Sequence, residues 1–485
     1  MTTLQKEPAG AARASRTAAG PLRPHVVDAV FHRNFLGYFS NPAGYVFITL
    51  FVAVGSLAAF FQPDFFARNL ANLDELNRAM PYLLLFFIPA ITMSAWAEER
   101  RQGTDELLLT LPARDVEVVL GKYLAALGIY TVALVFLAVG HVAVLKFLGK
   151  PDIGVLFATY LGYWLMGGML IAVGLVASML STNVTVAFIL GGVFAAIPIL
   201  LPLIAPILAA PAGLVSHSAA EPTRRLIESL SVPAQFRDFG AGVIPLAGIV
   251  YFLSLTVGLL YVNMVLLGRR HWAGGEGSRH HWVHATIRTV ALAVSLTSLV
   301  VLVGARLNTR LDASQAKLST LSPESKALVR QIPTDRPVYI QAYYSPEVPR
   351  EYVQTKTDLL NLLREYASIG GSRVHLNLVE TQRYSPEARD AEKQFGITPR
   401  RVLSTDEARQ SAEEIFLGVA FTSGPEEVVV PFFDRGLPVE YELTRSIRVV
   451  SRGQRKKVGI IDTDAKLLGG FDAQSMSQNN EWQIV

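Results

Sequence analysis

The chain has 485 residues, of which 51% are hydrophobic and 17% are charged, and its formal net charge is +4. So high a hydrophobic fraction in a long chain indicates a membrane protein of roughly two or three domains. The sequence contains no cysteine, which excludes disulfides, thiolate nucleophiles and cysteine-based zinc or iron–sulfur sites.

The N-terminal segment does not resemble a cleavable signal peptide. Residues 1–24 are rich in Ala, Arg, Thr and Pro and lack an apolar run. This composition predicts a disordered segment. We therefore expect residues 1–42 to form a cytoplasmic tail.

Seven apolar runs follow, each long enough, or nearly so, to cross a hydrocarbon core of about 30 Å as a helix. They comprise residues 43–62, 79–96, 119–146, 154–180, 184–208, 241–267 and 286–304. The fifth run contains Pro198, Pro202 and Pro206, and these prolines favour a pair of half-helices as an alternative to one helix.

Basic residues in the short loops predict the orientation of these spans. They occur in the N-terminal tail, after the second run at Arg100, Arg101 and Arg114, and after the sixth run at Arg269, Arg270 and Arg279. All three groups lie in the cytoplasm only if the N-terminus is cytoplasmic and successive runs cross the membrane in opposite directions. Everything after Gly304 is then expected outside the cytoplasm.

The region from residue 305 onward has charges of both signs and the pattern of a soluble domain. Strands are predicted at 337–344 and 373–379, with an amphipathic helix at 351–367 between them. Further strands are predicted at 415–422, 427–432 and 457–461, and a helix at 439–450. The predicted fold is therefore an α-helical polytopic membrane domain of six spans plus one (43–267 and 286–304), followed by an extracytoplasmic α/β domain at 305–485.

A polar stretch, Glu98 to Pro112, lies between the second and third runs. Gly103 is expected to end one helix, and Thr104 can cap the next, with Asp105 and Glu106 in a first turn that the helix dipole favours. Pro112 then ends that helix, and Asp115 can cap the third span. The stretch is either a charged elbow that transmits motion from a cytoplasmic motor or an ordinary interfacial linker.

Other polar residues lie in or near the spans. Lys122 stands near a membrane boundary and His141 lies within the third run. Intramembrane ionisable groups are candidates for function, although His141 can equally form hydrogen bonds between helices. No Asp or Glu lies in the middle of any run, which disfavours a proton- or sodium-coupled carrier.

Four histidines cluster before the seventh run, in a basic linker at 268–285: His271, His280, His281 and His284. A metal site is one interpretation, because neutral imidazole is a common ligand. The other is a partly cationic linker beside anionic lipid headgroups. We predict no metal site and no cofactor in this chain.

The sequence contains no G-x-x-x-x-G-K-[ST] motif, so it lacks the loop that cradles nucleotide phosphates in P-loop ATPases. The predicted βαβ start of the region from residue 305 resembles a thioredoxin-like layout. The absence of cysteine nevertheless excludes thiol redox chemistry. His375 is its only histidine and lies on a predicted strand, so no catalytic triad is indicated. We therefore expect the chain not to be an enzyme.

The segment from Glu98 onward resembles the type-2 permeases of ABC exporters. The residues that match the family pattern G-T-x-E-x-L-L-x-x-P and the following L-G-K are Gly103, Thr104, Glu106, Leu108, Leu109, Pro112, Leu120, Gly121 and Lys122. The resemblance covers about residues 25–270 and implies a GldF-like permease. It implies that Glu98, Glu99, Arg100 and Arg101 contact a separate ATPase subunit, which would bind ATP–Mg.

Residues 286–485 resemble the extracytoplasmic part of GldG-type auxiliary proteins, which are named for gliding motility. The similarity is carried by the sequences LSTLS at 318–322, VYIQAYYS at 338–345, LLREYA at 362–367, EKQFGITP at 392–399 and VEYELTRSI at 439–447. The resemblance implies a fusion of the two proteins that lacks most of the C-terminal half of the auxiliary partner, either because the gene product is short or because the sequence is a fragment.

These resemblances imply the permease of an ATP-driven exporter in a bacterial inner membrane, acting as a homodimer or paired with a similar permease. Membrane lipid and an envelope protein are the other expected partners, and nucleic acid is not. The alternative is a non-transporting anchor or scaffold of an envelope or gliding-motility-type complex. The substrate cannot be read from apolar spans.

Overall fold

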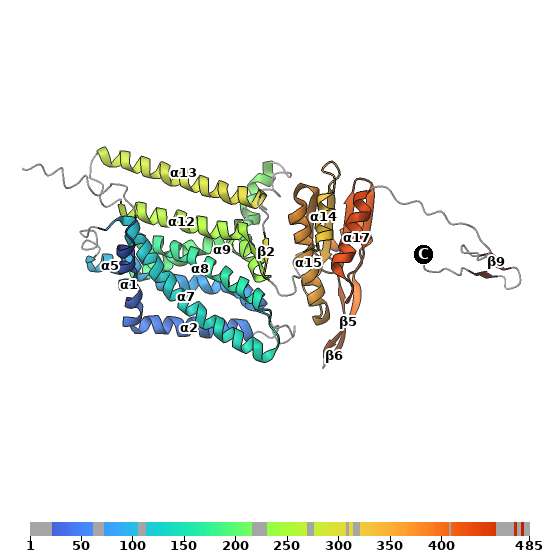
Figure 1. Ribbon diagram of the computed structural model, residues 1–485, viewed down its shortest axis with the longest axis horizontal. Helices are drawn as coiled ribbons and strands as arrows, with labels where there is room; N and C mark the ends of the chain where they lie inside the picture. Colours follow the sequence, from blue (N-terminus) through green and yellow to red (C-terminus); the bar gives the residue numbers. More distant parts are fainter. Residues whose placement is uncertain are drawn as a thin grey trace, which may run out of the picture. The chain divides into compact units, whose positions relative to one another are not determined.

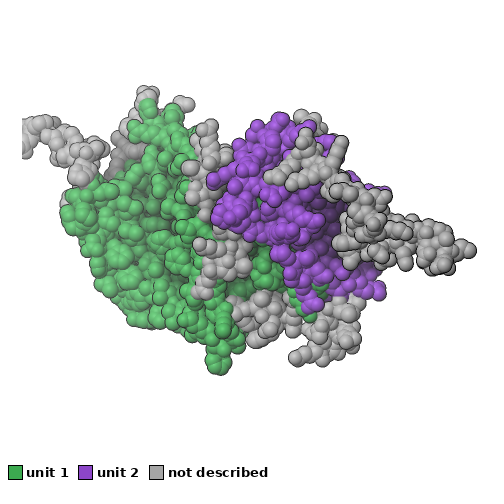
Figure 2. Space-filling view, turned by 45° about the vertical axis from the view of Figure 1, so that its right-hand side comes forward, with its two compact units in different colours: residues 1–321, 349–369 green, residues 322–348, 370–485 purple. Residues whose placement is uncertain are grey.

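The computed structural model describes residues 22–61, 72–104, 113–215, 230–268, 276–306, 310–313, 321–406, 409–452, 470–472 and 477–479. The chain divides into two compact units (Figure 2). The first comprises Met1–Leu321 and Pro349–Ile369, and the second comprises Ser322–Val348 and Gly370–Val485.

The first unit contains a bundle of long helices (Figure 1). They are α1 (Pro24–Ser40), α2 (Pro42–Phe60), α4 (Asp74–Thr92), α5 (Ser94–Gln102), α7 (Asp115–Leu148), α8 (Ile153–Leu180), α9 (Val184–Val215), α11 (Val232–Gly240), α12 (Leu246–Gly268) and α13 (Glu276–Arg306). Within the described residues, six segments are long and apolar enough to cross a membrane: Pro42–Phe60, Asp74–Gln102, Asp115–Leu148, Ile153–Leu180, Val184–Ile204 and Leu246–Gly268. These six confirm the predicted polytopic helical domain. The seventh span stays a prediction, since the apolar part of α13, Val283–Leu299, is shorter.

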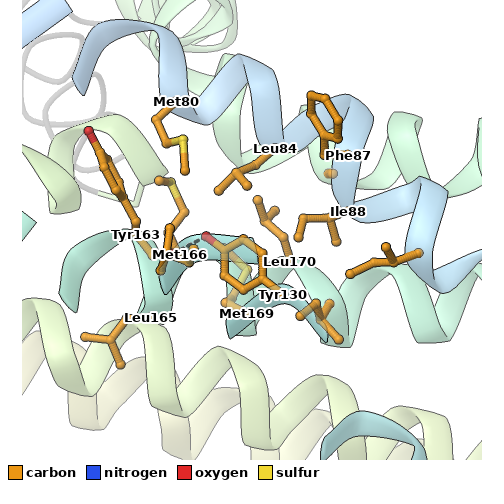
Figure 3. Packing of buried hydrophobic residues seen from close by; sticks show 14 of the residues in the cluster. Met80, Leu84, Phe87, Ile88, Tyr130, Tyr163, Leu165, Met166, Met169 and Leu170 are labelled. Atoms are coloured by element: carbon orange, nitrogen blue, oxygen red, sulfur yellow. Dashed lines mark hydrogen bonds between the residues drawn. The ribbon is translucent and has the colours of Figure 1, made fainter. Parts of the chain in front are cut away.

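Helix α8 forms the centre of the bundle, because 89% of its apolar window is buried, against 50% or less for the other five segments. Small residues allow neighbouring helices to approach it closely: a Cβ at Gly167 would lie 2.2 Å from the Tyr130 ring. Figure 3 shows Met166, Met169 and Leu170 of α8 among Met80, Leu84 and Ile88 of α4. In lipid such close packing, rather than exclusion of water, holds helices together.

Helix α9 is one continuous helix, so the alternative of two half-helices is wrong. Pro198, Pro202 and Pro206 are four residues apart and therefore lie on one face of the helix. Each proline removes a backbone hydrogen bond from that same side. The opposite side keeps its hydrogen bonds, and the helix continues through all three positions.

Residues 24–40, which the sequence analysis placed in the cytoplasmic tail, form helix α1. Val27, Val30, Phe31 and Phe35 recur at helical spacing on one of its faces. This face packs against α7, where a Cβ at Gly121 would lie 2.6 Å from Val30 and a Cβ at Gly128 would lie 3.0 Å from Phe35. Two glycines in α7 thus leave the space that α1 occupies.

The two ends of the bundle can be told apart by contacts between segments distant in sequence. At one end, Arg33 of α1 binds Glu99 of α5, and Arg100 of α5 binds the carbonyl of Met179 in α8. At the same end, Gly268 of α12 lies close to Asp115 of α7. At the other end, β1 (Val243–Pro245) pairs antiparallel with β2 (Arg310–Asp312), and the Ala313 N–H donates to the Gly242 carbonyl at 3.0 Å. Helix α13 packs along α12 and leads from the first end to the second (Figure 1).

The second unit contains a four-stranded sheet in the order β4-β3-β7-β8. Its strands are β3 (Val338–Tyr344), β4 (Val374–Glu380), β7 (Leu417–Ser423) and β8 (Glu426–Val430). β3 is parallel to β4 and antiparallel to β7, which pairs antiparallel with β8. Helix α15 (Arg350–Gly370), which belongs to the first unit except for its last residue, separates β3 from β4 in the chain. The predicted α/β architecture is confirmed, and the strand order agrees with a thioredoxin-like layout.

Other elements of the second unit complete this arrangement. They are α14 (Pro323–Arg330), α16 (Pro386–Phe395), α17 (Val439–Arg452), the hairpin of β5 (Arg400–Asp406) and β6 (Arg409–Ile415), and the short pair β9 (Gly470–Asp472) and β10 (Ser477–Asn479). Helix α16 covers the sheet face that carries Tyr343 and Ala420, while α17 packs against β7 and β8. The strand predicted at 457–461 lies outside the described residues.

Candidate functional site

The first half of the predicted coupling segment is the short helix α5, which directly follows α4. Gly103 ends it in the left-handed conformation, with φ of 70°, and the Gly103 N–H donates to the carbonyls of Glu99 and Arg100. Glycine adopts this conformation without steric cost. Arg100 and Arg101 lie in the last turn, where the helix dipole favours positive charge.

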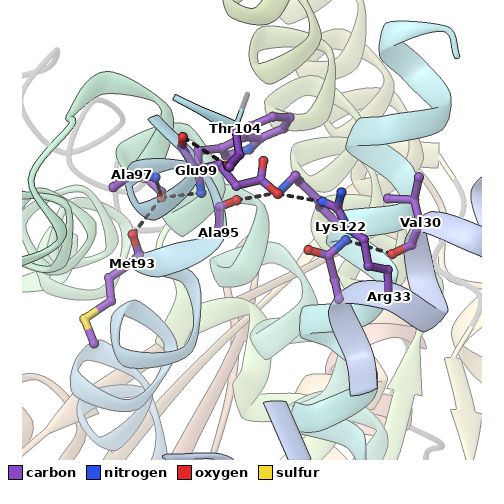
Figure 4. Close-up of polar contacts among 11 residues, drawn as sticks. Val30, Arg33, Met93, Ala95, Ala97, Glu99, Thr104 and Lys122 are labelled. Carbon is purple, nitrogen blue, oxygen red and sulfur yellow. Dashed lines mark hydrogen bonds and ion pairs between the residues drawn. The ribbon is translucent and has the colours of Figure 1, made fainter. Parts of the chain in front are cut away.

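Glu99 connects α5 to two other helices (Figure 4). Its Oε1 lies 2.8 Å from Nζ of Lys122 in α7 and 2.6 Å from Nη2 of Arg33 in α1. Lys122 Nζ also donates to the Ala95 carbonyl at 2.6 Å and stands 4.5 Å from the centre of the Trp96 ring. The Lys122 side chain is only 2% exposed, so its charge depends on these partners.

Helix α8 holds the start of α5 through Ser178. The Ser178 Oγ accepts hydrogen bonds from the N–H groups of Trp96 and Ala97, at 3.0 and 3.2 Å, and donates to the Met93 carbonyl at 2.8 Å. These bonds satisfy backbone groups that the junction of α4 and α5 leaves without helical partners. Arg100 adds a hydrogen bond to the carbonyl of Met179 at the end of the same helix.

A second ion pair joins the start of α1 to the start of α7. Arg23 Nη2 lies 2.8 Å from Glu117 Oε2, and the Arg23 N–H donates to Glu117 Oε1 at 3.1 Å. The hydrogen bonds and charge of Glu117 raise the pKa of Arg23 above its ordinary value. The Arg114 N–H also donates to Glu117, at 3.0 Å. Glu117, not Asp115 as expected, therefore caps α7, because Asp115 is itself the first helical residue.

The predicted contact residues divide into two sets. Glu99 and Arg100 are bound inside the bundle end, whereas Glu98 and Arg101 pair with each other at 2.7 Å, with 30% and 64% of their side chains exposed. Gln102 donates to Glu98 at 2.5 Å, and Thr104 Oγ1 donates to the Glu99 carbonyl at 3.3 Å. Glu106 and Pro112 lie outside the described residues. Glu98 and Arg101 are therefore the charged residues of the described segment that keep the most exposure, beside the exposed Gln102, Gly103 and Thr104.

The sequence analysis did not identify Arg23, Arg33 or Ser178 as partners of this site. A signal for the first two was present: the apolar spacing of Val27, Val30 and Phe31 predicts an amphipathic helix that contains Arg33 and starts next to Arg23. No comparable signal exists for Ser178, because its role depends on how α8 meets α5.

Four helices, α1, α5, α7 and α8, are fastened together by charged and hydrogen-bonded groups at one end of the bundle. No three His, Asp or Glu side chains gather as metal ligands within the described ranges. Of the four linker histidines, only the His284 side chain belongs to those ranges, so the metal interpretation of that cluster is not tested.

Two family models match the chain. Residues 65–225 match an ABC-2 family transporter protein, and residues 315–422 match a domain of unknown function (DUF7088). No curated protein and no solved structure matches the chain. The first unit thus carries an ABC-2 family transporter membrane region, and the chain is a multi-pass membrane protein. ABC-2 permeases are membrane components without catalytic activity of their own and generally pair with an ATPase subunit. The narrower GldF-like and GldG-like assignments stay predictions.

Proposed function

We propose that this chain is the permease subunit of an ATP-driven ABC exporter in a bacterial inner membrane and that it is coupled to a separate ATPase. The match of residues 65–225 to ABC-2 transporters, together with six apolar helices, supports the permease role. The observation that carries the coupling role is the Glu99–Lys122–Arg33 cluster, which joins α5 to two further helices.

The proposed mechanism follows from those bonds. A motor that binds ATP–Mg pushes on the exposed pair Glu98 and Arg101 at the end of α5. Because Glu99 ties α5 to α7 and α1, the three helices move together rather than α5 bending alone. Ser178 extends the same movement to α8, the buried centre of the bundle.

The basic loops favour a cytoplasmic position for the end that carries α1 and α5. Helix α13 leads from that end to the strand β2, and its 31 residues span about 46 Å as a helix. This length supports a seventh crossing and an extracytoplasmic second unit. We assign that unit a role in binding substrate or an envelope partner, as a fused auxiliary domain of the exporter, which acts as a homodimer or with a similar permease.

The test is co-purification with a candidate ABC ATPase from the same organism, and stimulation of its ATP hydrolysis in proteoliposomes. Replacing the exposed pair, by Glu98→Ala with Arg101→Ala, should weaken association because it removes groups that a partner can reach. The matched control is Glu442→Ala with Arg445→Ala, an ion pair of the same charges in the second unit, with 18% and 63% of its side chains exposed. The control should bind the ATPase like the unmodified chain.

Two results would contradict the proposal. Association and stimulation that are unchanged in the Glu98 and Arg101 variant would remove the assigned contact. If no P-loop ATPase binds the unmodified chain at all, the transport role fails, and a membrane anchor for an envelope complex becomes the better account.

A further inference from the structure

A groove of about 720 Å³ lies between α1 and α7, and its volume is in the range of sites that bind small organic molecules. One end of the groove lies at the start of α1, at Leu22, Pro24 and Asp28. The walls of the remaining part come from Val27, Phe31 and Phe35 of α1 and from Leu124, Leu127, Gly128 and Thr131 of α7.

These walls offer no free polar side chain to water. Thr131 carries the only hydroxyl among the wall residues. This hydroxyl donates to the Leu127 carbonyl at 2.6 Å and accepts a hydrogen bond from the indole N–H of Trp164 in α8 at 3.0 Å. A water molecule is stable inside a protein only where it has two or more polar partners. The groove beyond Asp28 therefore suits an apolar occupant.

The α7 wall lies at the level of the hydrocarbon core of the membrane. Between Lys122 and His141 this helix carries no charged side chain, and the stretch is about 27 Å long, close to the core thickness of about 30 Å. Residues 124–131 occupy its first half. Steps of three and four residues lead along the same face from Leu124 and Thr131 to Val135, which is 55% exposed. The groove is thus continuous with a face of α7 that lies within the bilayer.

The end of the groove at the start of α1 is charged. The Asp28 side chain is 65% exposed, and Arg23, which precedes α1, keeps 37% of its side chain exposed although it binds Glu117. The groove therefore leads from charged groups of both signs to an apolar interior. A phospholipid has the same polarity, with a charged headgroup at one end of its acyl chains.

We propose that one acyl chain of a membrane phospholipid occupies this groove and forms part of the packing between α1 and α7, with the headgroup beside Arg23 and Asp28. A helix of a second copy does not fit, because α1 and α7 already touch: a Cβ at Gly128 would lie 3.0 Å from Phe35. The seam between two such helices is too narrow for a third helix, which is about 10 Å wide. Only the choice of the cytoplasmic leaflet rests on the proposed function.

Photolabelling in the full-length protein tests this site. The protein is reconstituted in vesicles of phosphatidylethanolamine and phosphatidylglycerol that contain a phosphatidylethanolamine with a diazirine in one acyl chain, extracted in mild detergent and then illuminated. Lipid that only surrounds the spans exchanges with detergent. Residues 27–35 and 124–131 should therefore carry about tenfold more label than residues 135–139, a preference of about 1.4 kcal/mol. Equal labelling would mean bulk lipid alone and would overturn the site.

A larger side chain in the groove supplies the matched variant. Leu124→Trp fills the groove from a position that is 40% exposed, and it should lower the label on residues 27–35 to the level of residues 135–139. The control is Val135→Trp, which adds the same ring to the same face outside the groove and should leave the label in the groove unchanged. Undiminished labelling in Leu124→Trp contradicts the proposal.

Proteolysis measures the role of the bound chain in packing. Removing lipid with a strong detergent should speed cleavage within residues 24–40 of the unmodified chain, and adding phospholipid back should slow it again. Leu124→Trp should resist cleavage without lipid, because its ring replaces the acyl chain. Equal cleavage of the unmodified chain with and without lipid would overturn this role.

A single cysteine tests the other occupant, a second copy of this chain. The sequence contains no cysteine, so Leu124→Cys reports such a contact without background. After mild oxidation in the same vesicles it should give no more covalent dimer than Val135→Cys. A covalent dimer that forms preferentially in Leu124→Cys would show that a second copy reaches the groove, and the lipid would not be its occupant.

Discussion

Lys122 holds α5 against α7 at one end of the bundle. Its ammonium group is almost completely buried and is satisfied by the Glu99 carboxylate, the Ala95 carbonyl and the Trp96 ring. Such an arrangement adds little net stability, but removing one partner leaves a buried charge at a cost on the order of 3 kcal/mol. The neighbouring Gly121 has no side chain and lets α1 pack closely against α7. Two consecutive residues of α7 therefore contact two different helices.

His141 also joins helices. Its Nδ1 lies 2.8 Å from Tyr160 Oη in α8, its Nε2 lies 3.3 Å from Ser56 Oγ in α2, and its ring meets Phe60 edge to face. Both ring nitrogens therefore have partners. Of the two interpretations that the sequence allows, hydrogen bonding between helices accounts for these contacts without a transport role.

Tyr160→Phe should destabilise the protein by roughly 1–2 kcal/mol, because it leaves a buried imidazole nitrogen without its partner. Thermal unfolding in detergent measures the effect. Tyr82→Phe is the matched control, since Tyr82 is 51% exposed on α4 and its change should stay within about 0.5 kcal/mol. Equal shifts for the two variants would contradict a structural role for His141.

At the scale of elements, the docking of α1 on α7 depends on two glycines seven residues apart, Gly121 and Gly128. A side chain at position 121 would press on Val30 at 2.6 Å and on the Val27 carbonyl at 3.1 Å. The carbonyl belongs to the backbone and cannot rotate away. Helix α1, which contains Arg33 and directly follows Arg23, would have to move as a whole.

Gly121→Ala should therefore detach α1 from α7, although alanine favours a helix by about 1 kcal/mol over glycine. Faster proteolysis within residues 24–40 and a lower unfolding temperature are the expected results. Gly140→Ala is the control in the same helix, because nothing lies within 4 Å of its added Cβ. Equal resistance of both variants to protease would refute the close packing of α1.

In the second unit, Glu440 ties α17 to the start of α14. The Ser322 N–H donates to its Oε1 at 2.7 Å, and Ser325 bonds Thr444 one turn further, at 2.8 Å. Burial alone would raise the pKa of Glu440, but hydrogen bonds from Ser322 and Ser325, with the charge of Lys326, outweigh it and hold that pKa below its ordinary value.

Because the pKa of Glu440 is lower in the folded state, its contribution to stability is present above the unfolded pKa of about 4.5 and is lost as pH falls below it. Glu440→Gln should thus increase hydrogen exchange of residues 322–330 at pH 7. The difference from the unmodified chain should shrink as the pH is lowered through 4.5. A difference that stays constant with pH would show that the carboxylate charge is not responsible.

At the scale of the whole molecule, the patterns that depend on neighbouring residues predicted most of the fold. The lengths of the apolar runs indicated the six spanning helices, and the alternation at 373–379 and the amphipathic spacing at 351–367 indicated the βαβ start. Helix α1 was missed because the space for it is made by glycines some 90 residues further along the chain. The partners of Glu99 likewise come from two other helices, so no local pattern contains them.

The proposed topology predicts which side of the membrane each unit faces. Asn377→Cys in the second unit should react with a membrane-impermeant maleimide in intact cells from which any outer membrane has been removed. Glu98→Cys should react only after the membrane is opened, since α5 is expected in the cytoplasm. Labelling of Glu98→Cys in intact cells, or protection of Asn377→Cys, would reverse the topology.

The most direct test of the central claim is the rate of ATP hydrolysis by the partner ATPase when it is bound to Lys122→Met in proteoliposomes. Lys122 does not belong to the exposed pair, so the variant should still bind the ATPase. Without the bond between α5 and α7 it should lose most of the stimulation that the unmodified chain gives, and Lys122→Arg, which keeps the charge, should retain part of it. Full stimulation by a correctly folded Lys122→Met chain would contradict coupling through the Glu99–Lys122–Arg33 cluster.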